Sequence, residues 1–574
     1  MPLTTLSPMS LFRIALLCSA LLSGCAQRRA ETWPVREAAF SIVPESADAG
    51  FDRLAMLWGR GWSGALEEKV PPGTAGAAGL HGAIPVNRYA WTDGGIRFVP
   101  LADGWACLSF GPALPTETDR HVFRGAVALR ALCVQGIAAT NVSFGMRSGT
   151  APTGWTWQGK PGRFEADESG RQPSDTVAHI PESSRLEQRL WLAAGQPVTL
   201  RFSARALDPA GFRDVRPPSC GSAAAYSALR FFRRGVNLGN HLEAPPDEDW
   251  GARYDPADFE AIRAQGFDHV RLPVAWHHGM GEGPGHAIAR ERFERADALV
   301  RMAAEHDLAV ILNWHHFDAF TADPISQGRR FESGWMQIAR RYVRFPGRIA
   351  FELLNEPRDA ADTFAMNAVY ARVIPIIREH APETTLFVGP GQWNSALELP
   401  YLRLPRNDGN LVATVHHYEP FLFTHQGAEW TRPLTATSGL RFPGPGPEPL
   451  LPVSETAQAA DWTWVWFRAY SDLPKPLNPC GSEGLDYPLR LARAWSERTG
   501  RPVHVGEWGC IALAEPASRA RYHRAMRERL DAWDLPWALW DWKSHFRYWN
   551  PERNEPEPYL RPALFPAKPL PPFE

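Results

Sequence analysis

Two glutamates in the second half of the 574-residue chain directly follow apolar stretches of sequence. Glu356 stands in Asn355-Glu356-Pro357, and Glu507 stands in Gly506-Glu507-Trp508-Gly509. If both stretches are strands of one barrel, their ends lie at the same face, so the two carboxyl groups can converge. Paired carboxyl groups can serve as a proton donor and a nucleophile.

Other polar and aromatic residues also follow apolar runs, in an ordered series along the chain. The series comprises Gly235-Val236-Asn237-Leu238-Gly239-Asn240, Arg271-Leu272-Pro273, Asn313-Trp314-His315-His316, His416-His417-Tyr418 and Trp540. Any one of these signals is weak, because a single arginine at a strand end usually forms a structural ion pair. Together with the two glutamates they indicate a site built from the ends of many strands.

The elements that position these residues are alternating strands and helices, which indicate a parallel sheet. We expect strands near 233–240, 268–274, 308–316, 349–356, 385–390, 411–418, 502–508 and 537–542. Helical patterns such as Phe293 to His306 and Phe364 to His380 lie between them. Eight strands over this length predict an α/β fold, a (β/α)8 TIM barrel at 217–574, with catalytic groups at the carboxyl ends of its strands.

The segment from about 233 to 545 resembles glycoside hydrolase family 5, which contains many endo-β-glucanases and β-mannanases. The resemblance is carried by Arg234-Gly235-Val236-Asn237-Leu238-Gly239-Asn240, by Phe351-Glu352-Leu353-Leu354-Asn355-Glu356-Pro357, and by Tyr418-Glu419-Pro420 continuing through Thr424-His425-Gln426-Gly427-Ala428-Glu429-Trp430. It covers a little over half of the chain, and the first 215 residues do not share it.

The resemblance implies a retaining mechanism in which Glu356 is the acid/base and Glu507 is the nucleophile. Retaining enzymes hold these carboxyl groups about 5–5.5 Å apart. Substrate-binding or supporting roles are implied for Asn355 at the sugar 2-OH, Arg271 and Tyr418 at Glu507, His315 and His416 in the cleft, and Trp540 as the platform under the sugar. Trp430 is the best further platform candidate, ahead of Trp250, Trp276 and Trp393. No cofactor or metal is expected, because the paired histidines lack an acidic third ligand at zinc-site spacing.

The first part of the chain has a different rhythm. Short apolar runs such as Gly95-Ile96-Arg97-Phe98-Val99 alternate with turn residues, which is typical of strands. We therefore expect an all-β, sandwich-like accessory domain with its linker at 26–216, either binding carbohydrate or acting as a spacer. The chain has 24 Trp, whose flat apolar faces suit sugar rings as well as protein cores. Its net charge of -2 gives no indication of a nucleic-acid partner.

The N-terminus predicts export from the cytoplasm. Arg13 precedes a short apolar run from Ile14 to Leu22, which has the form of a signal peptide at 1–25. Its end, Leu22-Ser23-Gly24-Cys25, resembles a lipobox, so we expect a lipid on Cys25 and attachment to the cell envelope. Cys480 with Cys510, or Cys107 with Cys133, are plausible disulfide pairs, and the sequence leaves the pairing open.

Two regions depart from a simple barrel. The segment 419–482 is too long for a βα loop and predicts an insertion over the active face. The tail at 550–574 contains Pro551, Pro556, Pro558, Pro562 and Pro566, which prevent a continuous last helix and leave barrel closure open.

The expected function is hydrolysis of a β-linked polysaccharide, first of all as a monomeric endo-β-1,4-glucanase. Three alternatives stay open: a β-mannanase, an exo-acting β-glucosidase or β-mannosidase with one end of the cleft blocked, and a surface lipoprotein that binds glycan with little catalysis.

Overall fold

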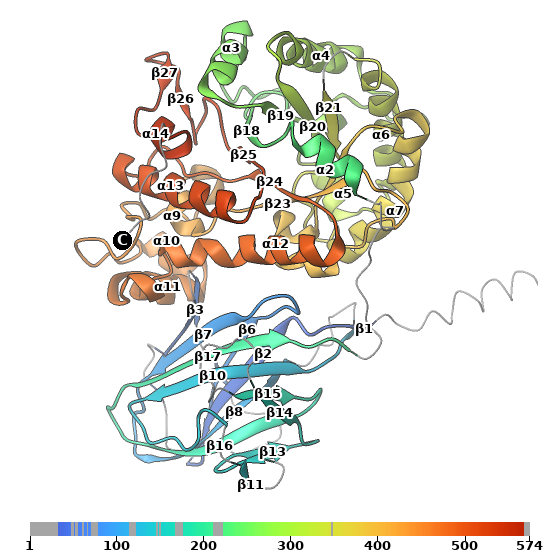
Figure 1. Cartoon of the computed structure of the whole chain (residues 1–574). Helices are drawn as coiled ribbons and strands as arrows, with labels where there is room; N and C mark the ends of the chain where they lie inside the picture. Colours follow the sequence, from blue (N-terminus) through green and yellow to red (C-terminus); the bar gives the residue numbers. More distant parts are fainter. Residues whose placement is uncertain are drawn as a thin grey trace, which may run out of the picture.

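The computed structural model describes two bodies, an N-terminal β-domain and a C-terminal barrel (Figure 1). The described residues are 32–46, 51, 55–59, 62–65, 67–69, 79–113, 122–144, 147–148, 151–166, 176–209, 222–345 and 348–566. The predicted signal peptide with Cys25, and most of the predicted linker, lie outside these residues. Within the described part of the chain, no helix combines the length and apolar character needed to cross a bilayer.

The β-domain consists of two mostly antiparallel sheets that pack face to face, as predicted. One sheet has the order β14 (Arg163–Ala166), β15 (Thr176–Ile180), β10 (Val127–Gln135), β17 (Val198–Ala206), β7 (Thr92–Phe98), β3 (Met56–Gly59), β4 (Trp62–Ala65). The other has the order β13 (Thr156–Gln158), β16 (Arg185–Leu192), β8 (Gly104–Pro112), β2 (Glu37–Pro44), β6 (Gly79–Pro85), β5 (Glu67–Lys69). Strands such as β2 and β16 alternate buried and exposed side chains, which places one face of each in a shared core.

Short pairs of strands complete this domain. They are β1 (Thr32–Trp33) with β9 (Val122–Phe123), which run parallel, and β11 (Arg147–Ser148) with β12 (Ala151–Pro152), which run antiparallel. The β1–β9 pair lies beside the barrel, where Trp33 and Phe123 pack with Tyr401.

Eight parallel strands form the closed barrel that the sequence predicts. They are β18 (Arg234–Asn237), β19 (His269–Val274), β20 (Ala309–Trp314), β21 (Ile349–Glu352), β22 (Leu386–Val388), β23 (Leu411–His416), β24 (Val503–Glu507) and β25 (Trp537–Leu539). The barrel closes because β25 pairs with β18. Strands β19, β20, β23 and β24 are buried along their whole length, as expected of strands that face a core on both sides.

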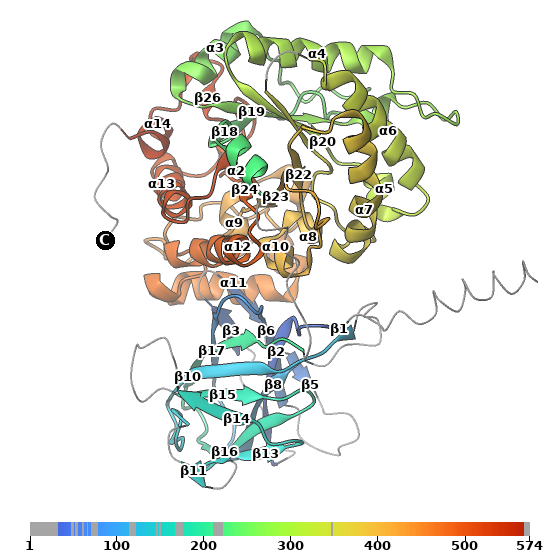
Figure 2. The same ribbon diagram turned by 45° about the vertical axis from the view of Figure 1, so that its right-hand side comes forward.

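Helices surround the barrel and pack on its strands (Figure 2). The main ones are α3 (Pro256–Gln265), α4 (Arg290–Glu305), α6 (Gly328–Tyr342), α7 (Thr363–His380), α12 (Asp486–Thr499) and α13 (Pro516–Ala532). Side chains fix where some of them begin: Asp255 and Asp258 form a capping box at α3, and Asp362 accepts the backbone N–H of Ala365 at α7. Short helices lie in the loops: α5 (Asp318–Ala322), α8 (Gly391–Asn394), and the 3₁₀ turns η1 (Trp276–Gly279) and η2 (Ala396–Tyr401).

The end of the barrel opposite the polar residues is filled by α2 (Ala223–Leu229) and Phe232. Their apolar side chains pack against interior residues of four strands, listed here together: Ala309, Ile311, Ala350, Phe387 and Val412. The interior is therefore a packed core at this end, although it also contains the buried rings of His269 and His504. The larger polar network lies at the carboxyl ends of the strands.

The segment after β23 divides into two parts with different neighbours. The first contains α9 (Phe421–Thr424) and η3 (Glu429–Thr431), close to the strand ends. The second contains α10 (Ser454–Ala459), α11 (Asp461–Asp472), η4 (Lys475–Leu477) and η5 (Ser482–Leu485). Ala469 and Leu473 pack with Met56 of the β-domain, and α11 lies beside β3 in Figure 1. The expectation that the whole insertion lies over the active face is thus wrong for α11, which lies between the two domains. One side packs on Met56, and Trp466, Phe467 and Tyr470 join the barrel core.

The proline-rich tail does not prevent closure of the barrel. It forms a small hairpin of β26 (Trp549–Asn550) and β27 (Glu555–Pro556), followed by the short helix α14 (Leu560–Leu564). The tail packs against α13 and α3, and buried Leu560 and Leu564 join the barrel core. Pairing of β25 with β18 closes the barrel without a long last helix.

The four cysteines in the described residues are free thiols, so the two disulfide pairs expected as plausible are absent there. Cys107 and Cys133 lie on β8 and β10, in opposite sheets, at positions that point away from the shared core. Cys480 and Cys510 are both buried, and the Cys480 thiol donates to the carbonyl of Arg441.

Candidate active site

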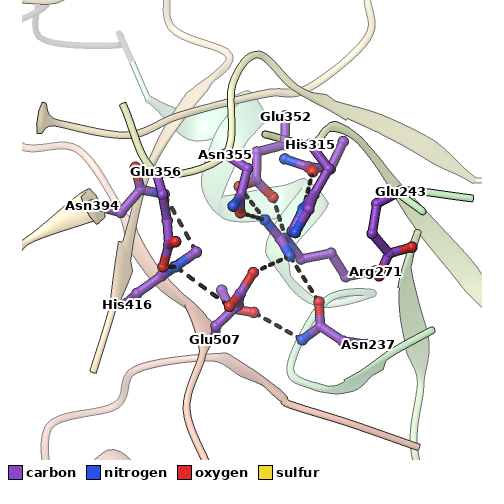
Figure 3. A network of polar contacts seen from close by, with 12 residues as sticks. Asn237, Glu243, Arg271, His315, Glu352, Asn355, Glu356, Asn394, His416 and Glu507 are labelled. Atoms are coloured by element: carbon purple, nitrogen blue, oxygen red, sulfur yellow. Dashed lines mark hydrogen bonds and ion pairs between the residues drawn. The ribbon is translucent and has the colours of Figure 1, made fainter. Parts of the chain in front are cut away.

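Arg271 is the centre of the polar network at the barrel mouth (Figure 3). It lies near the middle of β19 and is fully buried. Its Nε and Nη2 donate to the two oxygens of Glu352 at 2.6 and 2.9 Å, and its Nη1 donates to Glu507 Oε1 at 2.7 Å. Burial opposes the charge of Arg271, but the two carboxylates outweigh it and raise the arginine pKa. Arg271 is therefore a fixed cation.

Two asparagines complete the contacts of this guanidinium. Asn237 Oδ1 accepts from Nη1 at 2.8 Å, and Asn355 Oδ1 accepts from Nη2 at 2.6 Å. The Asn237 amide donates in turn to the carbonyls of Gly506 and Leu539, at 3.1 Å each. Asn237 thus ties together three strands at the mouth, and the Asn355 amide nitrogen is left facing His316 at 3.4 Å.

Glu507 ends β24 and has a contact on each oxygen. Oε1 accepts from Arg271, and Oε2 accepts from the Tyr418 hydroxyl at 3.0 Å. Burial, together with the nearby Glu356, raises the pKa of Glu507 above its ordinary value, although His416, Arg271 and the Tyr418 hydrogen bond act to lower it. These contacts all favour the charged form, so Glu507 is the carboxyl that is better prepared to be an anion.

Glu356 is held quite differently. The strand β21 ends at Glu352, four residues earlier, rather than at 356 as predicted. Asn355 N still donates to the carbonyl of Trp314, and Glu356 then turns the chain with a φ of +48°. Burial raises the pKa of Glu356, and His316 and Arg271 lower it only from a distance. Among the described residues, no arginine or lysine forms an ion pair with this carboxyl group, which favours its protonated form.

His416 lies between the two carboxyl groups. Its Nδ1 is 2.8 Å from Glu356 Oε1 and 3.6 Å from Glu507 Oε2. One oxygen of each glutamate and a nitrogen of His416 all lie within 4.8 Å of one another. Burial lowers the pKa of His416 to about 4, so the ring is neutral near pH 7. On the other side of the ring, His416 Nε2 is 3.3 Å from the amide nitrogen of Asn394.

Three acidic or imidazole groups this close could each offer a ligand atom to a cation. Their lone pairs are already engaged, however: Arg271 and Tyr418 occupy Glu507, and His416 Nδ1 faces Glu356. The arrangement suits proton transfer and attack by a carboxylate, since one carboxyl group lies beside a fixed cation and the other does not.

Trp540 forms an aromatic wall next to these groups. Its ring stacks on His315, with 5.7 Å between centroids and 7° between planes, and His315 Nδ1 is 2.9 Å from Asn313 Oδ1. Gly239 lies directly against the indole, because a Cβ there would come within 2.9 Å of two of its carbons. The indole is half-buried, so one part of it remains free at the mouth.

The other tryptophans considered from the sequence lie in different surroundings. Trp276 is fully buried, so its expected role as a platform is wrong: it packs against Phe293 in the core. Trp430 is 53% exposed and its ring lies near His425, and Trp393 is 52% exposed. Trp250 is exposed and donates to Glu248.

The structure brings together the predicted Arg271, Asn355, Glu356, His416, Tyr418 and Glu507, with His315 and Trp540 beside them (Figure 3). It adds residues to which the sequence assigned no role: Asn237, Glu352, Asn394 and Glu243. Glu352 could have been found from the sequence, because an acidic residue in an otherwise apolar strand needs a buried partner. Asn394 could not, because its position depends on a loop. Glu243 is buried and accepts backbone N–H groups of Asn240 and His241, and burial raises its pKa to about 7.

The family profile described as cellulase (glycosyl hydrolase family 5) matches residues 233–546, which include all eight strands and the whole polar network. The chain belongs to glycosyl hydrolase family 5. The match covers more than half of the chain and lies within the barrel. As a family 5 member, the protein is a glycoside hydrolase.

Individual relatives match a similar share of the chain. Endoglucanase H of Acetivibrio thermocellus is 26% identical over 331 residues, which are 57% of this chain and 31% of that protein. Endoglucanase C of the same organism is 28% identical over 340 residues, 56% of this chain and 95% of that protein. The structure of Thermotoga maritima Cel5A in complex with cellobiose is 28% identical with a TM-score of 0.52, and covers 59% of this chain and 100% of that one.

Proposed function

We propose that the protein is a retaining, endo-acting β-1,4-glucanase in which Glu507 is the nucleophile and Glu356 is the acid/base. The observation that carries this proposal is the unequal support of two close carboxyl groups. Arg271 and Tyr418 donate to the two oxygens of Glu507, whereas Glu356 is only partly buried and has no arginine or lysine partner among the described residues. Oxygens within 4.8 Å of each other fit the short separation of retaining enzymes, and inverting enzymes hold theirs about 6.5–9.5 Å apart.

In the first step, Glu507 Oε2 or Oε1 attacks the anomeric carbon of the sugar. The bond from that carbon to the glycosidic oxygen breaks, and the leaving oxygen takes the proton of Glu356. The product is a covalent glycosyl-enzyme, and Glu356 is left as a carboxylate. The Asn355 amide nitrogen lies at the mouth, where it can donate to the sugar 2-OH, and Trp540 offers an apolar face to the ring.

In the second step, water replaces the departed part of the glycan. Glu356 removes a proton from this water, the water oxygen bonds to the anomeric carbon, and the bond to Glu507 breaks. Glu356 recovers its proton and Glu507 recovers its charge. Two inversions give net retention, and the neutral His416 beside both oxygens keeps its ring nitrogen available as a hydrogen-bond partner in each step.

The substrate class is proposed from the relatives and from the exposed aromatic side chains. Two relatives are named endoglucanases, and the Cel5A structure is a complex with cellobiose. Trp540, Trp430 and Trp393 offer partly exposed rings around the mouth, and flat C–H faces of β-linked sugars pack well on such rings. Several partly exposed rings offer contacts to more than one sugar unit, which favours endo action.

Proton NMR of the first product of β-glucan hydrolysis tests the mechanism. We expect the β-anomer to accumulate before mutarotation. Initial release of the α-anomer would overturn both the retaining mechanism and the nucleophile assignment.

A panel of soluble glucan, mannan, xyloglucan and xylan tests the substrate class with the full chain. We expect the fastest reducing-sugar release from β-1,4-glucan, together with a rapid fall in viscosity. Faster cleavage of mannan would replace the glucanase assignment by mannanase, and release of monosaccharides with little fall in viscosity would replace endo by exo action.

We also propose an extracytoplasmic location with a lipid on Cys25, on the basis of the apolar run and Leu22-Ser23-Gly24-Cys25. Metabolic labelling with a fatty acid should mark the wild type and not Cys25→Ser. Equal labelling of both would exclude this anchor.

A further inference from the structure

We propose that the docked β-domain is part of the catalytic machinery, because Arg36 positions the acid/base Glu356 through a buried chain of contacts. This inference rests on the proposed function, and it concerns a residue outside the region matched by the family profile. Arg36 lies between β1 and β2 of the β-domain. It is a positioning residue, since it contacts neither glutamate of the site.

The first step of the chain is the docking of Arg36 on the barrel. Its guanidinium lies over three aromatic rings, at 4.6 Å from the centroid of Phe123, 4.7 Å from Tyr401 and 5.5 Å from Phe364. Its Nη2 donates to Glu398 Oε2 at 3.3 Å. Phe364 and Tyr401 belong to α7 and η2 of the barrel, so the cation is fixed by both domains.

The second step is internal to the barrel. Glu398 is nearly buried, and its Oε2 also accepts the Thr363 hydroxyl at 2.6 Å. The same hydroxyl oxygen accepts the backbone N–H of Gly391 at 3.0 Å. Gly391 lies so close to the start of α7 that a Cβ would come within 2.6 Å of the Thr363 nitrogen. A buried carboxylate that loses one partner keeps its desolvation cost. The loss of Arg36 therefore weakens the hydrogen-bonded arrangement of Glu398, Thr363 and Gly391.

The third step is the loop that Gly391 begins, which is the segment labelled α8 and has non-helical backbone. Gln392, Trp393 and Asn394 have φ values of 54°, 56° and 56°, three consecutive left-handed residues that are not glycine. Left-handed backbone is unfavourable for residues other than glycine, so the loop needs support from its surroundings. The hydrogen bond from Gly391 to Thr363 supplies support at its start.

The fourth step joins the loop to the acid/base. Trp393 N donates to the carbonyl of Pro357, the residue after Glu356, at 3.2 Å. Asn394 Nδ2 lies 3.3 Å from His416 Nε2, and His416 Nδ1 lies 2.8 Å from Glu356 Oε1. The loop therefore braces Glu356 through its backbone and through His416. Glu507 depends less on this loop, because its Oε2 is 3.6 Å from His416 Nδ1, beyond hydrogen-bond distance, and Arg271 and Tyr418 hold its two oxygens.

Substrates with different leaving groups test the inference in the full chain. A soluble β-glucan needs protonation of its leaving oxygen, whereas 2,4-dinitrophenyl β-cellobioside has a leaving group that needs none. For Arg36→Ala we expect kcat/KM on β-glucan to fall roughly ten- to a hundredfold, as for a small misplacement of a catalytic group. On the dinitrophenyl substrate, kcat/KM should stay within about twofold. Arg36→Lys, which keeps the charge, should recover part of the loss.

Arg189→Ala is the matched control. Arg189 is also an arginine of the β-domain with a carboxylate partner, Glu45, and an aromatic ring, Trp105, but both partners lie within that domain. We expect wild-type kinetics on both substrates. Equal loss on both substrates for Arg36→Ala, no loss on either, or the same loss for Arg189→Ala would overturn the inference.

If Arg36→Ala fails to fold, Thr363→Val breaks the same chain one contact later, and Thr363→Ser keeps the hydroxyl. The selective loss should appear in the valine variant and be absent in the serine variant; any other pattern would reject the route. Failure of the proposed function is distinct, because wild type would then release no β-anomer from β-glucan at all.

Discussion

The two catalytic carboxyl groups proposed here sit 4.8 Å or less apart but belong to two differently built regions. Glu507 ends a regular, fully buried strand and receives Arg271, itself fixed by Glu352, Asn237 and Asn355. Glu356 lies beyond its strand at a positive φ, and its support comes from His416 and the left-handed loop 392–394. The anion is thus held by the barrel interior, and the proton donor by the end of β23 together with a loop.

This difference follows from what each group must do. A nucleophile must be ionised when it attacks, and a buried cation on a neighbouring strand favours that form. A group that gives and takes a proton needs surroundings that do not fix its charge, so a neutral imidazole is a better neighbour than an arginine. Loops can supply such neighbours, but they need external bracing, whereas a strand does not.

Removal of the strand-held carboxylate should have the largest effect. In Glu507→Ala no covalent intermediate can form, so we expect kcat on β-glucan to fall by about 10⁴-fold or more. Reducing-sugar release measures it, with circular dichroism as the check on folding. A folded variant that keeps more than about a hundredth of wild-type activity would refute Glu507 as the nucleophile.

Removal of the loop-held carboxyl should give a loss that depends on the leaving group. For Glu356→Ala we expect a fall of about 10²–10⁴ in kcat/KM on β-glucan and little change on dinitrophenyl β-cellobioside. Added azide should raise turnover of the latter and yield the β-glycosyl azide, because the small anion replaces the water that needed a base. An α-azide would show that Glu356 is the nucleophile. Absence of any azide product would exclude Glu356 as the acid/base.

Arg271→Met tests the difference between Glu507 and Glu356 by removing only the cation that contacts Glu507. Two buried carboxylates then lack a partner, so the free energy of unfolding should fall by about 3–5 kcal/mol. Without the guanidinium the pKa of Glu507 rises, so the acidic limb of kcat/KM moves to higher pH. Denaturant titration and a pH profile measure the two effects. Arg271→Met with Glu352→Gln should recover part of the stability; a further loss would contradict this account of the network.

Tyr418→Phe should have the smallest effect of the four. It removes one hydrogen bond to Glu507 Oε2, worth about 1.5–3 kcal/mol when the acceptor is charged. We expect kcat/KM to fall about tenfold. Because the hydroxyl lowers the pKa of Glu507, the acidic limb should again move upward, by less than in Arg271→Met. An acidic limb that moves downward would show that the hydroxyl does not stabilise the anion.

Much of the barrel could be predicted from the sequence because periodicity and strand-end chemistry agree there. Buried parallel strands such as 309–314 and 411–416 are continuous apolar runs, and the polar residues at their ends can only converge. Arg271, Glu356 and Glu507 could be predicted as site residues for this reason. The two-sheet β-domain was visible through alternation and turn residues in the same way.

What the sequence could not give depends on contacts between distant segments. Asn394 is 22 residues from His416, and its left-handed neighbours carry no glycine signal. Arg36 is 362 residues from Glu398. Trp276 resembles any other tryptophan after a strand, and only the packing of Phe293 shows that it is core. Likewise, the helix 461–472 is apolar because it packs on the barrel core and on the β-domain, whereas its composition alone had suggested the active face.

The contact between Gly239 and Trp540 limits how far the indole can move at the barrel mouth. A single methyl group at position 239 would not fit beneath the indole, whose carbons would lie 2.9 Å away. The height of this aromatic floor is therefore dictated by main chain rather than by an adjustable side chain. Variation among the sugars that the protein admits must then come from other parts of the mouth. Laboratory evolution toward bulkier glycans should therefore change the loops around Trp393 and Trp430 and leave Gly239 untouched.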